Sequence, residues 1–202
     1  MKILVLVGSL RAGSINRAVA SALPALAPAD VEFEVFEGMG DVPLYNQDLD
    51  TAEPPAAVAH LRDSIRAADA LLFLTPEYNH SIPGVLKNAI DWASRPMFDS
   101  CLTGKSAAVV VSGPGRGGVR AFIATAGILR DLAVHVILHP EVVLNEAFTK
   151  LEIAADGTAT VVDPVSAKLL GVLLDQLRLA ALERAGDTNQ RTLHALRSAL
   201  MG

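Results

Sequence analysis

The residues of this chain that could do chemistry lie in two short loops, each following an apolar run. The first loop follows residues 2–7 and combines an arginine with hydroxyl and amide side chains just before an expected helix. Its candidate binding residues are Ser9, Arg11, Ser14, Ile15 and Asn16. A planar cation and the free N–H groups of a helix N-terminus suit a phosphate group. Simple capping of the helix by Ser14 and Asn16 is the alternative, but it explains neither Ser9 nor Arg11.

The first loop differs from two common nucleotide-binding loops. It is not followed by Gly-Lys-Ser/Thr, so it lacks the lysine and the magnesium-binding hydroxyl of a Walker loop. It also lacks the Gly-x-Gly-x-x-Gly pattern of dinucleotide-binding folds. A ligand with a single phosphate therefore fits better than one with a diphosphate.

The second loop, residues 76–84, follows the apolar run 70–75 and suits a flat ligand. Its candidate contacts are Pro76, Glu77, Tyr78 and Asn79. Its two prolines stiffen the backbone, and the tyrosine offers an aromatic surface to a planar ring. We expect the backbone amides of Glu77, Tyr78 and Asn79 to be free to meet the polar edge of that ring. An ordinary strand-to-helix turn is the alternative, but beside a phosphate loop the pattern indicates flavin mononucleotide (FMN).

A third loop, residues 112–118, contains four glycines and follows another apolar run. Ser112 and Gly113 stand where they could close the far side of the ring site. Arg116, and with it Arg120, could meet the 2′-phosphate of NADPH. A flexible turn that starts a helix explains the same residues equally well.

The elements that must position these loops alternate between strands and helices. Strands are expected at residues 2–7, 32–36, 70–75, 106–112 and 134–138, and helices at residues 16–26, 56–68, 85–94, 117–133 and 163–186. A short strand or hairpin is also expected near residues 159–162, and a tail helix at residues 188–201. This alternation predicts an α/β fold, a flavodoxin-like doubly wound five-stranded parallel sheet in the order 2-1-3-4-5 with helices on both faces. We expect an FMN-binding domain at residues 1–186 and a C-terminal tail helix at residues 187–202.

Composition narrows the function classes. The chain has 202 residues and a net charge of −5 without a basic run, which argues against nucleic-acid binding. No apolar run reaches the length of a membrane-spanning helix, so no membrane partner is expected. The single cysteine excludes an intrachain disulfide framework, and the five histidines show no zinc-type spacing, so we expect no metal. These features favour a cytoplasmic enzyme.

The loop sequences resemble the NADPH-dependent FMN reductase family, which includes quinone, chromate and azo-dye reductases. Its motif Gly-Ser-x-Arg-x-x-Ser-x-Asn matches residues 8–16. Its longer motif Pro-Glu-Tyr-Asn-x-Ser-x-Pro-Gly-x-Leu-Lys-Asn-Ala-Ile-Asp-Trp matches residues 76–92 without a gap. The resemblance implies that the first loop holds the FMN phosphate, that residues 76–79 line the isoalloxazine ring, and that Ser112 and Gly113 close the site.

The resemblance also implies an activity and an assembly. The chain would be an NAD(P)H-dependent FMN reductase or quinone-type reductase, passing hydride from NADPH or NADH through flavin to a small-molecule acceptor such as free flavin, a quinone, an azo compound or chromate. We expect no catalytic side chain, because the flavin carries the chemistry. The family implies a homodimer or a dimer of dimers (homotetramer), with Leu86, Ile90 and Trp92 at the subunit contact. The alternative is a flavodoxin-type electron carrier that binds FMN without oxidising NADPH.

Overall fold

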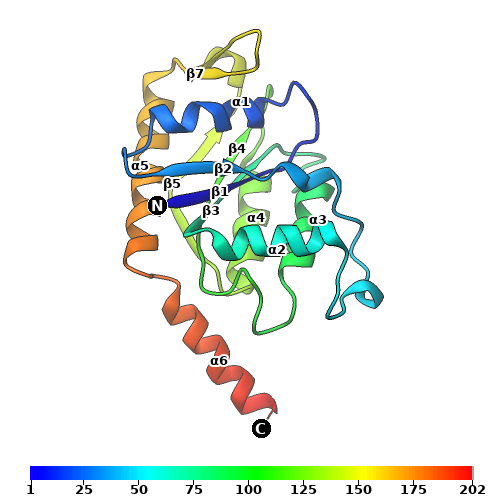
Figure 1. The fold of residues 1–202 in the computed structure, drawn as a ribbon. Helices are drawn as coiled ribbons and strands as arrows, with labels where there is room; N and C mark the ends of the chain where they lie inside the picture. Colours follow the sequence, from blue (N-terminus) through cyan, green and yellow to red (C-terminus); the bar gives the residue numbers. More distant parts are fainter. Residues whose placement is uncertain (202) are drawn as a thin grey trace.

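A computed structural model describes residues 1–201 of the chain and contains a five-stranded parallel sheet in the order β2-β1-β3-β4-β5 (Figure 1). The strands are β1 (Lys2–Val7), β2 (Glu32–Val35), β3 (Ala70–Thr75), β4 (Ser106–Ser112) and β5 (His135–Leu144). The order reverses beside β1, so the loops after β1 and β3 leave two neighbouring strands at one edge of the sheet. The predicted flavodoxin-like fold is confirmed.

Helices cover both faces of the sheet. They are α1 (Ile15–Ala22), α2 (Ala56–Ala67), α3 (Gly84–Ala93), α4 (Val119–Asp131) and α5 (Pro164–Leu182); a sixth helix, α6 (Asp187–Met201), follows α5. Alternate residues of the central strands pack into two separate cores. One core contains the apolar side chains of α2, α3 and α4, and the other contains those of α1 and α5. Because β1, β3 and β4 are covered on both sides, they read as continuous apolar runs rather than alternating ones.

Strand β5 is longer than the predicted strand at residues 134–138. The expected end lay just before Pro140, since proline lacks an N–H group for the ladder. In the structure the register between β4 and β5 shifts between Ala108 and Val110, and pairing resumes with Val110 opposite Val142. The ladder is therefore interrupted around the proline and resumes beyond it, which lengthens the strand.

Three smaller differences concern turns and ends. The predicted helix at residues 16–26 is divided into α1 and a 3₁₀ turn, Leu23–Ala25, which contains Pro24. The predicted strand near residues 159–162 is one half of an antiparallel hairpin of β6 (Leu151–Ile153) and β7 (Ala159–Val161). Helix α5 is capped by Asp163 as expected but ends at Leu182, before the predicted end at residue 186.

The C-terminal helix α6 leaves the body of the molecule at the amino ends of the strands (Figure 1). Its path depends on Gly186, because a Cβ atom there would lie 1.8 Å from the carbonyl oxygen of Gly104, in the turn before β4. Farther along, Leu193 is half-buried, whereas Leu196 and Leu200 are exposed. None of the helices described is both long enough and apolar enough to cross a bilayer.

Deleting residues 187–202 is expected to leave FMN affinity within about twofold of the full chain. The deleted helix starts at the amino ends of the strands, whereas the candidate cofactor loops follow their carboxyl ends, and distant sites contribute independently. Fluorescence titration of FMN onto both chains measures the affinity. A much weaker affinity of the shortened chain would contradict the proposed division into a cofactor domain at residues 1–186 and a separate tail.

Candidate flavin site

Three loops meet at the carboxyl edge of β1, β3 and β4. The first two are joined by Ser9 and Tyr78, whose hydroxyl oxygens are 3.5 Å apart. Their strands approach closely at Gly8, where an added Cβ atom would lie 2.8 Å from Oγ1 of Thr75. The backbone N–H of Gly8 donates to the carbonyl of Leu74 at 2.8 Å. The residue at position 8 must therefore be small for the two loops to lie side by side.

The first loop presents unpaired donors. Within residues 1–201, no acceptor is assigned to the backbone N–H groups of residues 10–13, nor to those of residues 15 and 16 at the start of α1. Ser14 is the N-cap of α1, and its Oγ accepts from the N–H of Arg17 at 3.4 Å. Arg11 is exposed and donates from Nη2 to the carbonyl of Gly13 at 3.2 Å, so its guanidinium lies over its own loop. This arrangement suits a phosphate monoester.

Asn16 and Ser112 form a pair that spans two loops. Nδ2 of Asn16 donates to the backbone carbonyl of Ser112 at 3.2 Å, and Oγ of Ser112 donates to Oδ1 of Asn16 at 2.7 Å. Both residues are buried. Their side chains thus hold the start of α1 against the end of β4, and their predicted contacts with the cofactor stay predictions.

The second loop contains a tight two-residue turn. Tyr78 and Ser81 exchange backbone hydrogen bonds of 3.1 and 3.0 Å, and the residues between them, Asn79 and His80, have φ values of 50° and 63°. Two successive positive φ values are typical of a type I′ hairpin turn. The expectation that the Tyr78 amide is free is therefore wrong, because its N–H donates to Ser81. For the amides of Glu77 and Asn79, no acceptor is assigned among residues 1–201.

Pro76 and Tyr78 are the residues of the second loop that best suit a flat ligand. Pro76 is buried at the end of β3, while Tyr78 is 45% exposed despite its contact with Ser9. An accessible aromatic ring beside unpaired amides of the backbone suits a planar heterocycle with a polar edge.

Backbone contacts hold the third loop to the segment that follows β5. Gly113 donates to the carbonyl of Leu144 at 3.2 Å and accepts from the N–H of Ala147 at 3.0 Å. Arg116 is exposed, and its Nε donates to the carboxylate of Glu146 at 3.0 Å. Arg116 therefore lies at the open rim of the loop, as expected of a residue that meets a coenzyme from solvent, although its role stays a prediction.

Glu77 has a role that the sequence did not indicate. Its side chain reaches α4, where its Oε2 accepts from the backbone N–H of Ala121 in the first turn of the helix at 3.1 Å. Burial acts to raise the pKa of Glu77, but backbone N–H groups of Ala121, Arg120 and Gly118, together with His80, lower it below its ordinary value. The carboxylate is therefore ionised at neutral pH.

The expectation that Leu86, Ile90 and Trp92 lie at a subunit contact is wrong for these side chains. All three are at most 2% exposed within the single chain. The indole Nε1 of Trp92 donates to the carbonyl of Pro43 at 2.7 Å, and Tyr45 packs edge-on at 4.9 Å. The apolar stripe of α3 faces the sheet of its own chain, which period alone cannot distinguish from a stripe facing a partner.

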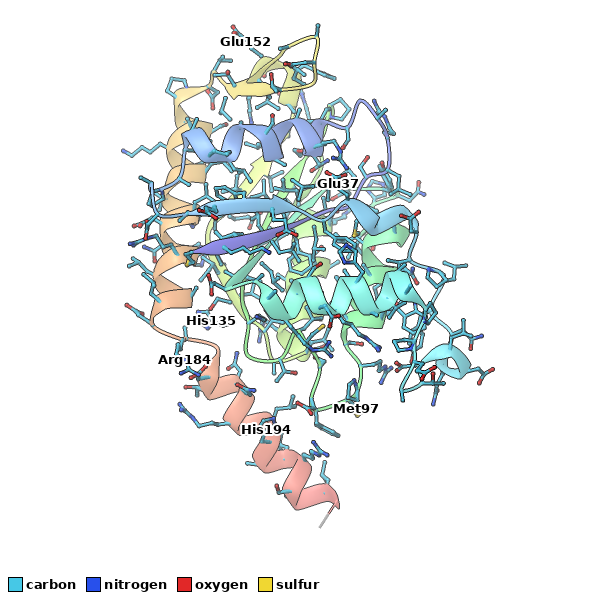
Figure 2. All side chains as sticks on the ribbon, in the orientation of Figure 1. Glu37, Met97, His135, Glu152, Arg184 and His194 are labelled. Carbon is cyan, nitrogen blue, oxygen red and sulfur yellow. The ribbon has the colours of Figure 1, made fainter. Side chains whose placement is uncertain are left out.

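A pocket of about 270 Å³ adjoins the first loop on its β2 side. It is lined in part by Ser9, Leu10 and Met39, and by Arg17 and Glu37, which form a bidentate ion pair with both bonds at 2.8 Å. Figure 2 shows Glu37 beyond the end of β2. In the part of the chain that the structure describes, no group of three histidine, cysteine, aspartate or glutamate residues is placed to hold a metal ion.

Comparisons with known proteins identify the family of the chain. The family model described as NADPH-dependent FMN reductase matches residues 1–149. The chain belongs to this family. It is 47% identical over 149 residues to a quinone reductase of Pseudomonas putida, covering 73% of this chain and 80% of that protein. It is 42% identical over 180 residues to an NAD(P)H-dependent FMN reductase of Pseudomonas aeruginosa, covering 89% and 94%.

A solved structure extends the likeness to three dimensions. The flavoenzyme NAD(P)H:(acceptor) oxidoreductase FerB of Paracoccus denitrificans superposes with a TM-score of 0.79 at 37% identity, covering 91% of this chain and 98% of that one. The chain is therefore an NAD(P)H-dependent FMN oxidoreductase. None of these findings supports the electron-carrier alternative.

Proposed function

We propose that this enzyme uses FMN, held by the three loops at the carboxyl edge of the sheet, to transfer two electrons from NAD(P)H to a quinone. The proposal that the first loop binds the FMN phosphate rests on its unpaired backbone amides and on Arg11 beside them. The proposal that the second loop binds the isoalloxazine ring rests on the exposed Tyr78 and on the backbone amides of Glu77 and Asn79. The names of the Pseudomonas putida relative and of others support a quinone as acceptor.

The chain's own residues bind and orient. Ser9, Ser14 and Arg11 supply donors to the phosphate, and the first turn of α1 adds its N–H groups and the positive end of its dipole. Pro76 and the turn at Tyr78 would support the isoalloxazine ring. Asn16 and Ser112 brace the first loop against the third, so that the two sides of the site keep their spacing.

When bound by these loops, FMN would supply the redox chemistry: uptake of a hydride from the nicotinamide and release of two electrons to the acceptor. The balance is that NAD(P)H, a proton and a quinone give NAD(P)⁺ and a hydroquinone. The protein therefore needs no general base or nucleophile of its own. Arg116, at the rim of the third loop, and Arg120, in the first turn of α4, would meet a 2′-phosphate and favour NADPH over NADH.

The test is anaerobic mixing of the FMN-loaded protein with NADPH, followed by a quinone. Loss of the flavin absorption band on addition of NADPH, and its return with a quinone, would support the proposal. A flavin that binds but stays oxidised after NADPH is added would contradict it. Turnover rates with a quinone, free FMN, an azo dye and chromate would then rank the acceptors.

Replacing Arg11 by alanine is expected to weaken FMN binding about 10- to 100-fold, because a charge-assisted hydrogen bond to a phosphate contributes about 1.5–3 kcal/mol. Riboflavin, which lacks the phosphate, should bind both proteins equally. Fluorescence quenching titrations with the two ligands measure this difference. An Arg11→Ala variant that binds FMN as tightly as the unmodified protein would rule out the phosphate role.

We further propose a cytoplasmic homodimer or dimer of dimers. The resemblance to the family supports the assembly, and Val119 and Ile123 on α4 are 49% and 62% exposed, so their apolar side chains are available to a second copy. Light scattering of the purified protein distinguishes a monomer from these assemblies. Fractionation of the source cells tests the location.

A further inference from the structure

Helix α4 begins without a cap of its own. Its N-cap is Gly118, which has no side chain to accept from the first N–H groups of the helix. The first N–H groups of any helix need an acceptor outside it when they are shielded from water. The sequence that starts α4 therefore leaves these donors to a residue from elsewhere in the fold.

Glu77 provides that acceptor from the neighbouring loop. Its Oε2 is 3.1 Å from the N–H of Ala121, and its side chain is only 13% exposed. Its Oε1 lies 3.5 Å from Nδ1 of His80, and it would be 3.1 Å from a Cβ atom added at Gly117. The carboxylate thus fills the space between the loop at residues 76–83 and the glycine turn before α4.

We propose that Glu77 is a positioning residue that sets the distance between the flavin loop and the glycine-rich loop, and so places the nicotinamide coenzyme over the flavin ring. The inference rests on the proposed function. It assigns the Glu77 side chain a task different from lining the ring: it holds the wall of the site that carries Arg116.

Three arguments support this task over a general contribution to stability. The hydrogen bond between Glu77 and Ala121 joins the loop expected to hold the flavin to the start of the helix that follows the loop expected to hold NAD(P)H. The carboxylate is ionised, since N–H groups of α4 lower its pKa despite burial. Hydride transfer is sensitive to small errors in distance, so a shift of one wall by about 1 Å is enough to slow it about 100-fold.

The experiment compares Glu77→Gln and Glu77→Ala with the unmodified protein and with Glu152→Gln. Glu152 is an exposed carboxylate on β6, and Figure 2 shows it on the outer hairpin. Each FMN-loaded protein is mixed anaerobically with NADPH, and separately with dithionite. Dithionite reduces flavin chemically and needs no positioned coenzyme. Rates are expressed per bound flavin, and the visible circular dichroism of the flavin is recorded.

We expect reduction by NADPH to be about 10- to 100-fold slower in Glu77→Ala. Glu77→Gln should be intermediate, because its amide oxygen can still accept one hydrogen bond. Reduction by dithionite should stay within about twofold in both variants, and Glu152→Gln should match the unmodified protein. The circular dichroism of the bound flavin should change in the Glu77 variants alone.

Two results would overturn the inference. One is an NADPH rate per bound flavin in Glu77→Ala that equals that of Glu152→Gln, even if the variant melts at a lower temperature. The other is a proportional change in the NADPH and dithionite rates, which would indicate a general loosening of the site. Failure of the unmodified protein itself to bind FMN or to react with NADPH would instead refute the proposed function.

Discussion

Replacing Trp92 by alanine is expected to lower the free energy of unfolding by about 3–5 kcal/mol, the usual range for removing a large aromatic side chain from a core. The indole is fully buried, and the guanidinium of Arg62 lies 5.7 Å from its ring centroid. Its removal also deprives the carbonyl of Pro43 of its 2.7 Å hydrogen bond. Because domains of this kind have total stabilities of about 5–15 kcal/mol, the loss is a large part of the whole.

Urea denaturation followed by far-ultraviolet circular dichroism measures this loss. Trp92 is the only tryptophan, so intrinsic tryptophan fluorescence cannot follow the variant. Trp92→Phe is the matched control, because it keeps an aromatic ring in the core but removes the N–H donor. Its free energy of unfolding should fall by about 1–2 kcal/mol. If Trp92→Ala unfolded at the urea concentration of the unmodified protein, the indole would not be a core side chain, and its place at a subunit contact would need to be reconsidered.

The fold could be predicted because each element carries a strong local signal. The apolar runs that become β1, β3 and β4 are covered on both faces, so their composition alone indicates a buried parallel sheet. The loops of the candidate site followed from topology, since the carboxyl ends of neighbouring parallel strands share one edge. The bounds were less accurate where a proline or a break in strand pairing interrupts the periodic pattern, as at Pro140 and Pro24.

Side-chain partners across loops could not be predicted. From the sequence, Asn16 is a candidate helix cap or ligand donor. Only the packing of α1 against the end of β4 reveals its hydrogen bonds with Ser112. From the sequence, Glu77 is part of a ring-binding motif. In the structure its carboxylate accepts a hydrogen bond from Ala121 of α4, 44 residues later in the chain. One signal was available: the expected helix at residues 117–133 starts with two glycines that have no side chain to cap it, so an acidic residue from a neighbouring loop was a candidate.

The expectation that α3 lies at a subunit contact came from the family resemblance and not from its side chains. Leu86, Ile90 and Trp92 form an apolar stripe. Such a stripe indicates that the helix face is buried, but it does not indicate whether the same chain or a partner subunit buries it. Here the sheet of the same chain and the segment around Pro43 cover it. The contact surface of an assembly must be sought among exposed apolar residues, which the sequence cannot separate from buried ones.

Replacing Gly118 by alanine is expected to lower the free energy of unfolding by about 2–4 kcal/mol. Its φ of 136° is a conformation that residues with a side chain rarely adopt, and strain of this kind costs about 1–3 kcal/mol. A Cβ atom there would also lie 2.6 Å from Cγ1 of Val143 and 3.1 Å from Cγ1 of Val111, so the core under the loop would be overpacked.

Gly115→Ala in the same loop provides the matched control. A Cβ atom at position 115 meets nothing within 4 Å, so this change should alter stability by less than about 0.5 kcal/mol. Chemical denaturation of both variants gives the difference, and equal stabilities would contradict the backbone argument. Because Gly118 also aims the first N–H groups of α4 at Glu77, we expect Gly118→Ala to slow reduction by NADPH as well, while Gly115→Ala leaves it unchanged. The two glycines differ in backbone conformation and in what lies beneath them, so this pair tests whether the shape of the turn at Gly118 sets the coenzyme wall.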